Sequence, residues 1–425
     1  MQLVLTIPRL TIAAAVFCSF IIVGLFVADF FRILPSIGIV GITLTAICYT
    51  VLHRGREERL YNDWRIYAAL ACVFLVHVAA GVNTSAHNLG EYTKDVVLQS
   101  PFLLLPLAFW LLPALPSRYL ARLWQLFIGC VTGAALVATG NYLLHAAEIN
   151  EMYLHSKIMP TEPDHIRFSL MVTLATAAAV VLLAFDSTLS GLKRGGLVTA
   201  VVLLALFQHL LAVRSGLVTF YAVGVMMAGW LLRQRAYRRA ALVLTVLVAL
   251  PLVSYVSFPT FRNKFVNTQD DLNEVNNTAA ANNYSLVARV YSYKVAAKLV
   301  KDNPWFGVSK ADMPEEMAKH YAADYPSIRP QSYIQPHNQF IYSAVAFGLI
   351  GVLVFTLCFY YPLLWTWPRF APLVIIQYVI VSLSFLVEYT LETQIGLTYS
   401  LFFILLGLNG LRLNPAEAPP SWRPA

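Results

Sequence analysis

Long apolar stretches, each near the length that spans a bilayer, recur along most of this 425-residue chain. A helix needs about 20 consecutive apolar residues to cross the hydrocarbon core of a membrane. Twelve stretches approach this length, at about residues 10–28, 33–52, 64–82, 97–115, 119–146, 166–185, 193–211, 214–232, 238–256, 337–364, 368–388 and 394–412. The pattern predicts an all-α, polytopic membrane protein with about twelve transmembrane helices.

A mostly polar segment, from Ser257 to Pro336, interrupts this pattern between the ninth and tenth stretches. Residues 268–283 are rich in Asn, Asp and Thr, which favours irregular structure. Residues 285–301 carry apolar side chains at spacings of three and four, which predict an amphipathic helix on the outer membrane face. The apolar side chains are Leu286, Val290, Tyr293, Ala297 and Val300.

The chain is therefore predicted to have four parts. Residues 1–256 form helices 1–9, residues 257–336 form a large, partly helical external loop, and residues 337–412 form helices 10–12. Residues 413–425 are rich in proline and are expected to be a disordered cytoplasmic tail.

Basic residues are distributed unevenly over the predicted connections. With both termini and every second connection in the cytoplasm, the cytoplasmic side holds sixteen Lys and Arg residues, against five in the short outer connections. The sixteen are Arg9, Arg54, Arg56, Arg59, Arg65, Arg118, Arg122, Lys193, Arg194, Arg233, Arg235, Arg238, Arg239, Arg369, Arg412 and Arg423. Cytoplasmic connections are normally enriched in Lys and Arg, so we expect cytoplasmic termini and an external 257–336 loop. The net charge of +8 then reflects topology and gives no reason to expect a nucleic-acid partner.

His337 is the first candidate for chemistry, because it lies where the polar loop meets the tenth apolar stretch. A histidine with an ordinary pKa accepts a proton near neutral pH, which suits a general base. The amides of Gln335, Asn338 and Gln339 beside it suit sugar hydroxyls. A purely structural alternative is that these four side chains satisfy the exposed start of a helix.

Arg214 is the second candidate, because it falls in a break between two apolar stretches that is too short to leave the hydrocarbon. An arginine there is energetically expensive, and its planar fork matches phosphate oxygens. The alternative is that it extends to lipid headgroups. Arg289 is a weaker third candidate whose value comes from pairing with Arg214.

Five further side chains of the external loop and the last outer turn have less specific signals. Lys294 and Lys298 belong to a basic ridge that is either solvated or meets a phosphorylated substrate, and Trp305 lies in an aromatic turn. Glu388 and Glu392 are suitably spaced to orient His337 or an arginine, but we expect a solvated turn.

Composition narrows the class of protein further. With 58% hydrophobic and 12% charged residues, the chain is too apolar for a soluble domain of this length. All five cysteines fall within predicted helices, so neither a disulfide framework nor a cysteine metal site is expected. The sequence has no Asp-x-Asp pair and no glycine-rich phosphate loop, and we therefore expect neither a metal nor a nucleotide cofactor.

The chain resembles the O-antigen ligases and, more broadly, the superfamily of O-antigen ligases, O-antigen polymerases and bacterial O-oligosaccharyltransferases. The resemblance covers nearly the whole length, and three local features carry it. These are Arg214 at an outer helix break, the segment from Arg289 to Asn303-Pro304-Trp305-Phe306-Gly307, and Pro336-His337-Asn338 leading into Phe347-Gly348-Leu349-Ile350-Gly351.

The resemblance implies a fold of the integral-membrane lipid-sugar glycosyltransferase type (GT-C) in the inner membrane of a Gram-negative bacterium, with the active site in the periplasm. Arg214 and Arg289 would bind the diphosphate of an undecaprenyl-diphosphate-linked O-antigen, and His337 would be the catalytic base. The acceptor would be a core-sugar hydroxyl of the lipid A-core oligosaccharide, and the reaction would invert the anomeric carbon without metal or ATP.

The local features do not separate a ligase from a polymerase. The single large loop late in the chain favours a ligase, and the short C-terminal tail disfavours an oligosaccharyltransferase. A flippase for lipid-linked sugars is the alternative of a different class, but it should carry charges deep in several helices. Here the charges gather toward the outer side.

Overall fold

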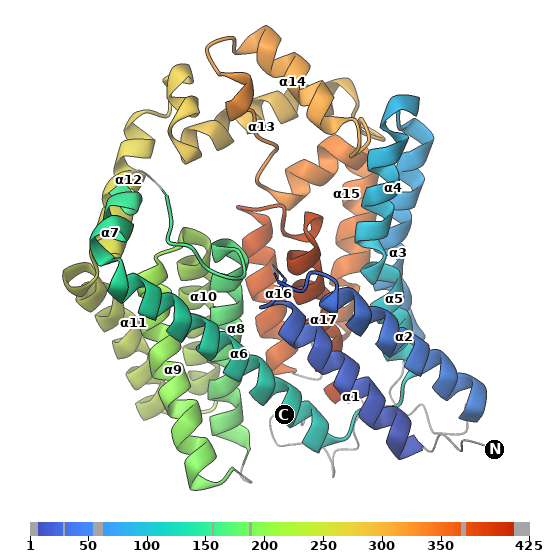
Figure 1. Ribbon diagram of the computed structural model, residues 1–425, viewed down its shortest axis with the longest axis vertical. Coiled ribbons are helices and arrows are strands. Elements are labelled where there is room, and N and C mark those ends of the chain that lie inside the picture. Colours follow the sequence, from blue (N-terminus) through green and yellow to red (C-terminus); the bar gives the residue numbers. More distant parts are fainter. Residues whose placement is uncertain are drawn as a thin grey trace.

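A bundle of apolar helices capped on one side by polar helices makes up the protein in the computed structural model (Figure 1). The structure describes residues 7–28, 30–53, 63–154, 157–186, 189–366 and 371–411, and within these ranges every regular element is helical. The predicted tail at 413–425 and six of the basic residues lie outside the described residues, namely Arg54, Arg56, Arg59, Arg369, Arg412 and Arg423.

Each of the twelve predicted apolar stretches is largely helical where it is described. The helices are α1 (Ile7–Gly24), α2 (Leu34–His53), α3 (Trp64–Ala79), α4 (Leu89–Gln99) followed by α5 (Pro101–Leu111), α6 (Ser117–Leu144), α8 (His165–Phe185), α9 (Gly191–Leu211), α10 (Arg214–Arg233), α11 (Tyr237–Ser257), α15 (Gln339–Thr366), α16 (Pro372–Phe385) and α17 (Gln394–Gly410). Among the described residues, nine helical segments are long and apolar enough to cross a membrane, and three more are apolar but shorter. The protein is thus a multi-pass membrane protein, as the hydropathy pattern predicts.

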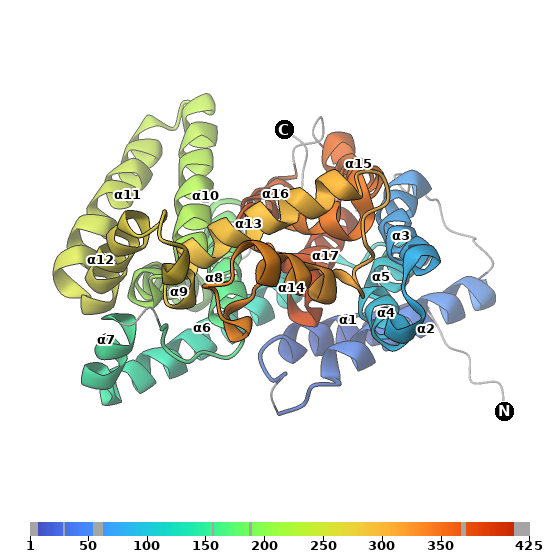
Figure 2. The same cartoon turned by 90° about the horizontal axis from the view of Figure 1, so that it is seen from above.

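The segment between α11 and α15 folds into the cap, which contains α12 (Pro259–Asn273), α13 (Ser285–Asp302) and α14 (Met313–Asp324). A short helix, α7 (Ala146–Leu154), lies beside α12. Seen from above, α13 crosses the bundle from the α12 side to the α15 side (Figure 2). The start of α1 lies at the opposite end of the molecule from the cap (Figure 1).

The cap has a hydrophobic core of its own, separate from the core of the bundle. It joins Tyr291 and Val295 of α13 to Tyr321 of α14 and Ala346 of α15. The predicted helix at 285–301 is present, but the predicted apolar face is wrong: none of the five apolar side chains is buried, and the buried face lies almost opposite the predicted stripe. Small side chains explain the difference, since Ala288, Ser292 and Ala296 are buried and allow the α13 backbone to approach its neighbours closely.

Residues 268–273 belong to α12 and are not irregular as the composition suggested. Asn and Asp are poor helix formers mainly because they compete for backbone hydrogen bonds. In α12 this competition is removed because their side chains bond elsewhere. Asn267 donates to the carbonyl of Tyr153, and Asp271 accepts from Arg214. Tertiary contacts therefore override the local preference.

Two of the three local features that carry the family resemblance interlock in the fold. The α15 helix is broken at Gly348, which has φ +66°, and the freed backbone N–H of Leu349 donates to the Pro304 carbonyl at 2.8 Å. On the other side of the break, Val308 and Ser309 donate to the carbonyls of Val345 and Ala346 at 2.9 and 3.0 Å. A Cβ at Gly348 would lie 2.2 Å from the Trp305 carbonyl oxygen, so only glycine permits this contact. The interlock fixes the cap to the outer half of α15.

Candidate active site

His337 lies directly before α15, at the boundary between cap and bundle. The helix begins here because the Asn338 side chain accepts from the backbone N–H groups of Phe340 and Ile341, at 2.9 and 3.0 Å. The Tyr293 hydroxyl of α13 donates to the His337 carbonyl at 2.8 Å. The cap, through Tyr293, and the start of α15, through Asn338, therefore both hold the backbone around His337.

The imidazole of His337 is paired with a buried carboxylate. Its Nδ1 contacts Glu388, whose side chain is 2% exposed, while the His337 side chain is 21% exposed. A carboxylate only accepts hydrogen bonds, so Nδ1 carries a proton in this pair, and in the neutral imidazole Nε2 presents the lone pair. This is the arrangement in which a histidine works as a general base with a carboxylate fixing its tautomer.

A cavity of about 330 Å³ opens beside this pair. His337 and Gln335 line it, together with the aromatic rings of Tyr333 and Tyr389. The Tyr389 ring centroid lies 4.9 Å from that of His337. The imidazole therefore borders an open space lined partly by polar side chains.

Arg214 is the first residue of α10 and faces α12 of the cap. Its Nε donates to the Thr268 hydroxyl and one Nη to Asp271, both at 2.9 Å. The Asp271 side chain is fully buried, whereas that of Arg214 is 33% exposed. The pair fixes the orientation of the guanidinium and leaves part of its surface accessible.

Lys264 of α12 is a second cation close to Arg214. It lies on the same face of α12 as Thr268 and Asp271, at spacings of four and seven residues, and it is 8% exposed. Burial, reinforced by the charge of Arg214, lowers the pKa of Lys264 to about 8. Arg289 lowers the pKa further and Asp271 opposes the shift, so all three charges act on this ammonium.

Arg289, in the second turn of α13, acts through its charge both on Lys264 and on side chains next to His337. Its charge acts on Lys264 on one side and on the hydroxyls of Tyr293 and Tyr389 on the other. These are the two tyrosines that contact His337. Burial raises the pKa of the Tyr293 hydroxyl, and the Arg289 charge opposes this shift.

The structure thus brings Arg214, Lys264, Arg289 and the His337–Glu388 pair to one region under the cap. Within the described part of the chain, neither the Lys264 ammonium nor the Arg289 guanidinium has an ion pair or a hydrogen bond to another side chain. Like charges held close together destabilise each other unless an anion lies between them. The three cations therefore form an electropositive cluster on the same side of the cap as the imidazole.

The remaining residues singled out from the sequence are placed differently. The Gln339 side chain is buried and both ends of its amide bond within the protein, to Glu392 and to the N–H of Leu391. Lys294 lies over the Tyr291 ring, Lys298 pairs with Asp324 at 2.7 Å, and the exposed Trp305 takes part in the α15 interlock through its backbone. Of the amides near His337, the structure places only that of Gln335 at the cavity beside the imidazole.

The expectation of a solvated outer turn at Glu388 and Glu392 is wrong. Their side chains are 2% and 3% exposed, because residues 388–392 fold inward between α15 and α4. Lys264 was not singled out from the sequence at all. The signal was available in the polar side chains of residues 260, 264, 267, 268 and 271, which share one helical face, but the surrounding Asn and Asp residues obscured it.

Comparison with known families finds a match for the part of the chain that carries these residues. A search of curated proteins found no match for the chain. Residues 199–356, which contain Arg214, Lys264, Arg289 and His337, match the model of a family described as O-antigen ligase. This part of the chain is therefore similar to the O-antigen ligase family.

Proposed function

We propose that the protein is an O-antigen ligase. It transfers O-antigen polysaccharide from undecaprenyl diphosphate to a sugar hydroxyl of the lipid A-core oligosaccharide, at the periplasmic face of the inner membrane. The fold is then of the GT-C type, and both termini lie in the cytoplasm. The observation that carries this proposal is the cluster of Arg214, Lys264 and Arg289 beside the His337–Glu388 pair.

The reaction follows from this arrangement. The acceptor hydroxyl attacks the anomeric carbon of the first O-antigen sugar from the face opposite the diphosphate, forming the new C–O bond with inversion. The bond between that carbon and the phosphate oxygen breaks, and undecaprenyl diphosphate leaves with the electron pair. Nε2 of His337 takes the proton of the attacking hydroxyl, and Glu388 stabilises the imidazolium that forms.

The cations act on the leaving group. Negative charge grows on the bridging phosphate oxygen as the bond breaks, and preorganised cations stabilise it without needing to reorient. Arg214 contributes a fork that Asp271 and Thr268 hold in place. Arg289 and Lys264 contribute charges free to bind phosphate oxygens. A diphosphate is a good leaving group, so no general acid is required.

The test is a reaction with two acceptors. Purified protein is incubated with undecaprenyl-diphosphate-linked glycan and either rough lipopolysaccharide or additional lipid-linked glycan. A ligase places glycan on the lipopolysaccharide. Longer chains on undecaprenol would indicate a polymerase, transfer to an added acceptor protein would indicate an oligosaccharyltransferase, and lipid-linked glycan moved across a vesicle without transfer would indicate a flippase.

Glu388→Gln is expected to lower kcat by at least about 10²-fold with little change in the KM for the donor. The amide can donate to Nδ1 and thereby favours the tautomer whose Nε2 carries the proton, which removes the base. The measurement is steady-state transfer to rough lipopolysaccharide, with Glu91→Gln as control because Glu91 is 62% exposed on α4. Wild-type kcat in Glu388→Gln would show that the carboxylate does not serve the base.

Donor binding is expected to weaken as the pH rises through about 8, since that is the pKa of Lys264 without bound anion. A bound diphosphate favours the charged ammonium, so affinity is highest below this pKa and declines above it. The KM for the donor should rise about tenfold between pH 7 and pH 9. Lys264→Met should have a high, pH-independent KM over this range, whereas the exposed Lys157→Met should retain the wild-type profile. A wild-type KM that stays constant from pH 7 to 9 would remove Lys264 from the donor site.

A further inference from the structure

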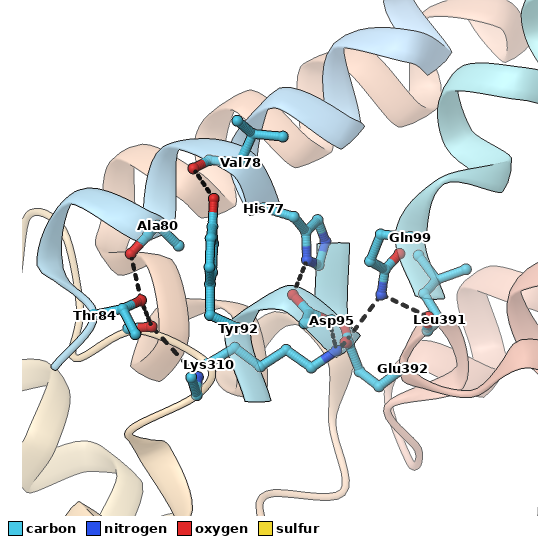
Figure 3. Close-up of polar contacts among 12 residues, drawn as sticks. His77, Val78, Ala80, Thr84, Tyr92, Asp95, Gln99, Lys310, Leu391 and Glu392 are labelled. Atoms are coloured by element: carbon cyan, nitrogen blue, oxygen red, sulfur yellow. Dashed lines mark hydrogen bonds and ion pairs between the residues drawn. The ribbon is translucent and has the colours of Figure 1, made fainter. Parts of the chain in front are cut away.

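A second group of charged side chains lies buried on the other side of the cap, among α3, α4 and the segment that follows α13 (Figure 3). The Lys310 ammonium contacts the carboxylates of Asp95 and Glu392, and Asp95 also accepts from Nδ1 of His77 at 2.9 Å. The four side chains are between 3% and 14% exposed. The mechanism proposed above uses none of them.

The charges in this group depend on one another. Burial by itself would lower the pKa of the Lys310 ammonium, but Glu392 and Asp95 outweigh that effect and hold the pKa above its ordinary value. Lys310 is therefore a cation, and it compensates two carboxylates that burial would otherwise make unfavourable. Removing it leaves both carboxylates in a site that excludes water.

Lys310 itself is held firmly against the bundle. The preceding Ser309 donates its N–H to the Ala346 carbonyl of α15 and shares a hydrogen bond of 2.7 Å with the Thr84 hydroxyl. Two residues after Lys310, Asp312 accepts from the N–H of Ser85 and the amide of Asn88, at 2.8 and 2.7 Å. The ammonium is thus a fixed point that joins the cap to the α3–α4 region.

The turn at residues 386–392, which carries Glu388, is attached to this fixed point through Glu392. Glu392 bonds to Lys310, to the Gln99 amide at 3.2 Å and to the Gln339 amide at 2.7 Å. Gln339 in turn accepts from the N–H of Leu391 at 3.0 Å and lies two residues after His337. The two partners of the His337–Glu388 pair are therefore tied together on both sides by the same network.

We propose that Lys310, through Asp95 and Glu392, is a positioning residue that holds the 386–392 turn so that Glu388 meets the imidazole of His337. Lys310 touches neither substrate nor reacting atoms. It fixes the distance between the Glu388 carboxylate and the His337 imidazole, and it affects the rate only through this distance. This inference rests on the proposed function, because it assigns His337 the role of base.

Lys310→Met is expected to lower kcat by about 10–100-fold and to change the KM for the donor less than about twofold, because a displacement of about 1 Å at a catalytic group has effects of this size. Lys310→Arg keeps the cation and should return kcat to within about threefold of wild type. The matched control is Lys319→Met, which removes an exposed cation of α14 that pairs with Glu315 and Glu316. Wild-type kcat in Lys310→Met, or an equal loss in Lys319→Met, would overturn the proposal.

A second readout does not depend on activity. Hydrogen–deuterium exchange of the peptide over residues 386–393 is compared among wild type, Lys310→Met and Lys319→Met in nanodiscs. Exchange of the Leu391 amide should become at least about tenfold faster in Lys310→Met alone. Unchanged exchange in that variant would overturn the proposal, even if kcat fell.

If Lys310→Met does not fold, the positioning role of Lys310 is tested with Glu392→Gln, which keeps the shape of the turn. It should show the same direction of change in kcat and exchange, and wild-type values for both would overturn the proposal. Wild-type protein that transfers glycan to no acceptor would refute the proposed function instead. The exchange comparison would then still decide whether Lys310 holds the turn.

Discussion

Replacing His337 with alanine is expected to reduce transfer to rough lipopolysaccharide by about 10²–10⁴-fold, the usual contribution of a positioned general base. The variant should still insert and fold, because the backbone contacts at this position come from the Tyr293 hydroxyl and the Asn338 cap. The measurement is kcat with saturating donor and acceptor.

His87→Ala is the matched control for this result, since His87 lies in the short segment between α3 and α4, pairs with a carboxylate and is 65% exposed. It should have wild-type activity. Near-normal turnover by His337→Ala would exclude the histidine from proton transfer and leave the cation cluster as the main source of rate acceleration.

Arg214→Lys is expected to lower kcat/KM for the donor by about 10²–10³-fold, although the positive charge is kept. The guanidinium uses Nε and one Nη to bond Thr268 and Asp271, and part of its surface stays accessible. A lysine ammonium has no planar fork and cannot make both contacts and bind phosphate oxygens in the same geometry. Transfer and donor KM are measured together.

Arg262→Lys provides the control, because Arg262 is exposed on α12, the helix that also carries Lys264 and Asp271. The same chemical change there should leave both constants unaltered. Wild-type kcat/KM in Arg214→Lys would indicate that Arg214 serves only to hold α12 on α10.

Hydropathy predicts most of the fold, because a membrane imposes one rule on every segment that crosses it. The positions of α6, α8 and α9 follow from this rule within a few residues. The same rule says little about the cap. There, α12 is stabilised by contacts of Asn267 and Asp271 with residues distant in the sequence, although Asn and Asp are poor helix formers.

The residues of the candidate site also divide into those that the sequence identifies and those that depend on contacts made only in the fold. His337 and Arg214 stand out individually, because an arginine or a histidine at a hydrocarbon boundary is unusual, whereas Arg289 gains its value from pairing with Arg214. Lys264 and Glu388 do not, since each resembles an ordinary polar residue of a loop until the fold buries it beside its partner. The glycine of the α15 interlock is visible in the sequence, but its contact with Trp305 is known only from the structure.

The central claim is that a diphosphate is bound under the cap between the cations and the base. Its most direct test is the structure of the protein with undecaprenyl diphosphate, determined by electron cryomicroscopy in nanodiscs. The account predicts diphosphate density within hydrogen-bonding distance of Arg214, Lys264 and Arg289, on the His337 side of the cluster. Density for the diphosphate at the opposite end of the bundle, or on the lipid-facing side of α10 away from these cations, would contradict it.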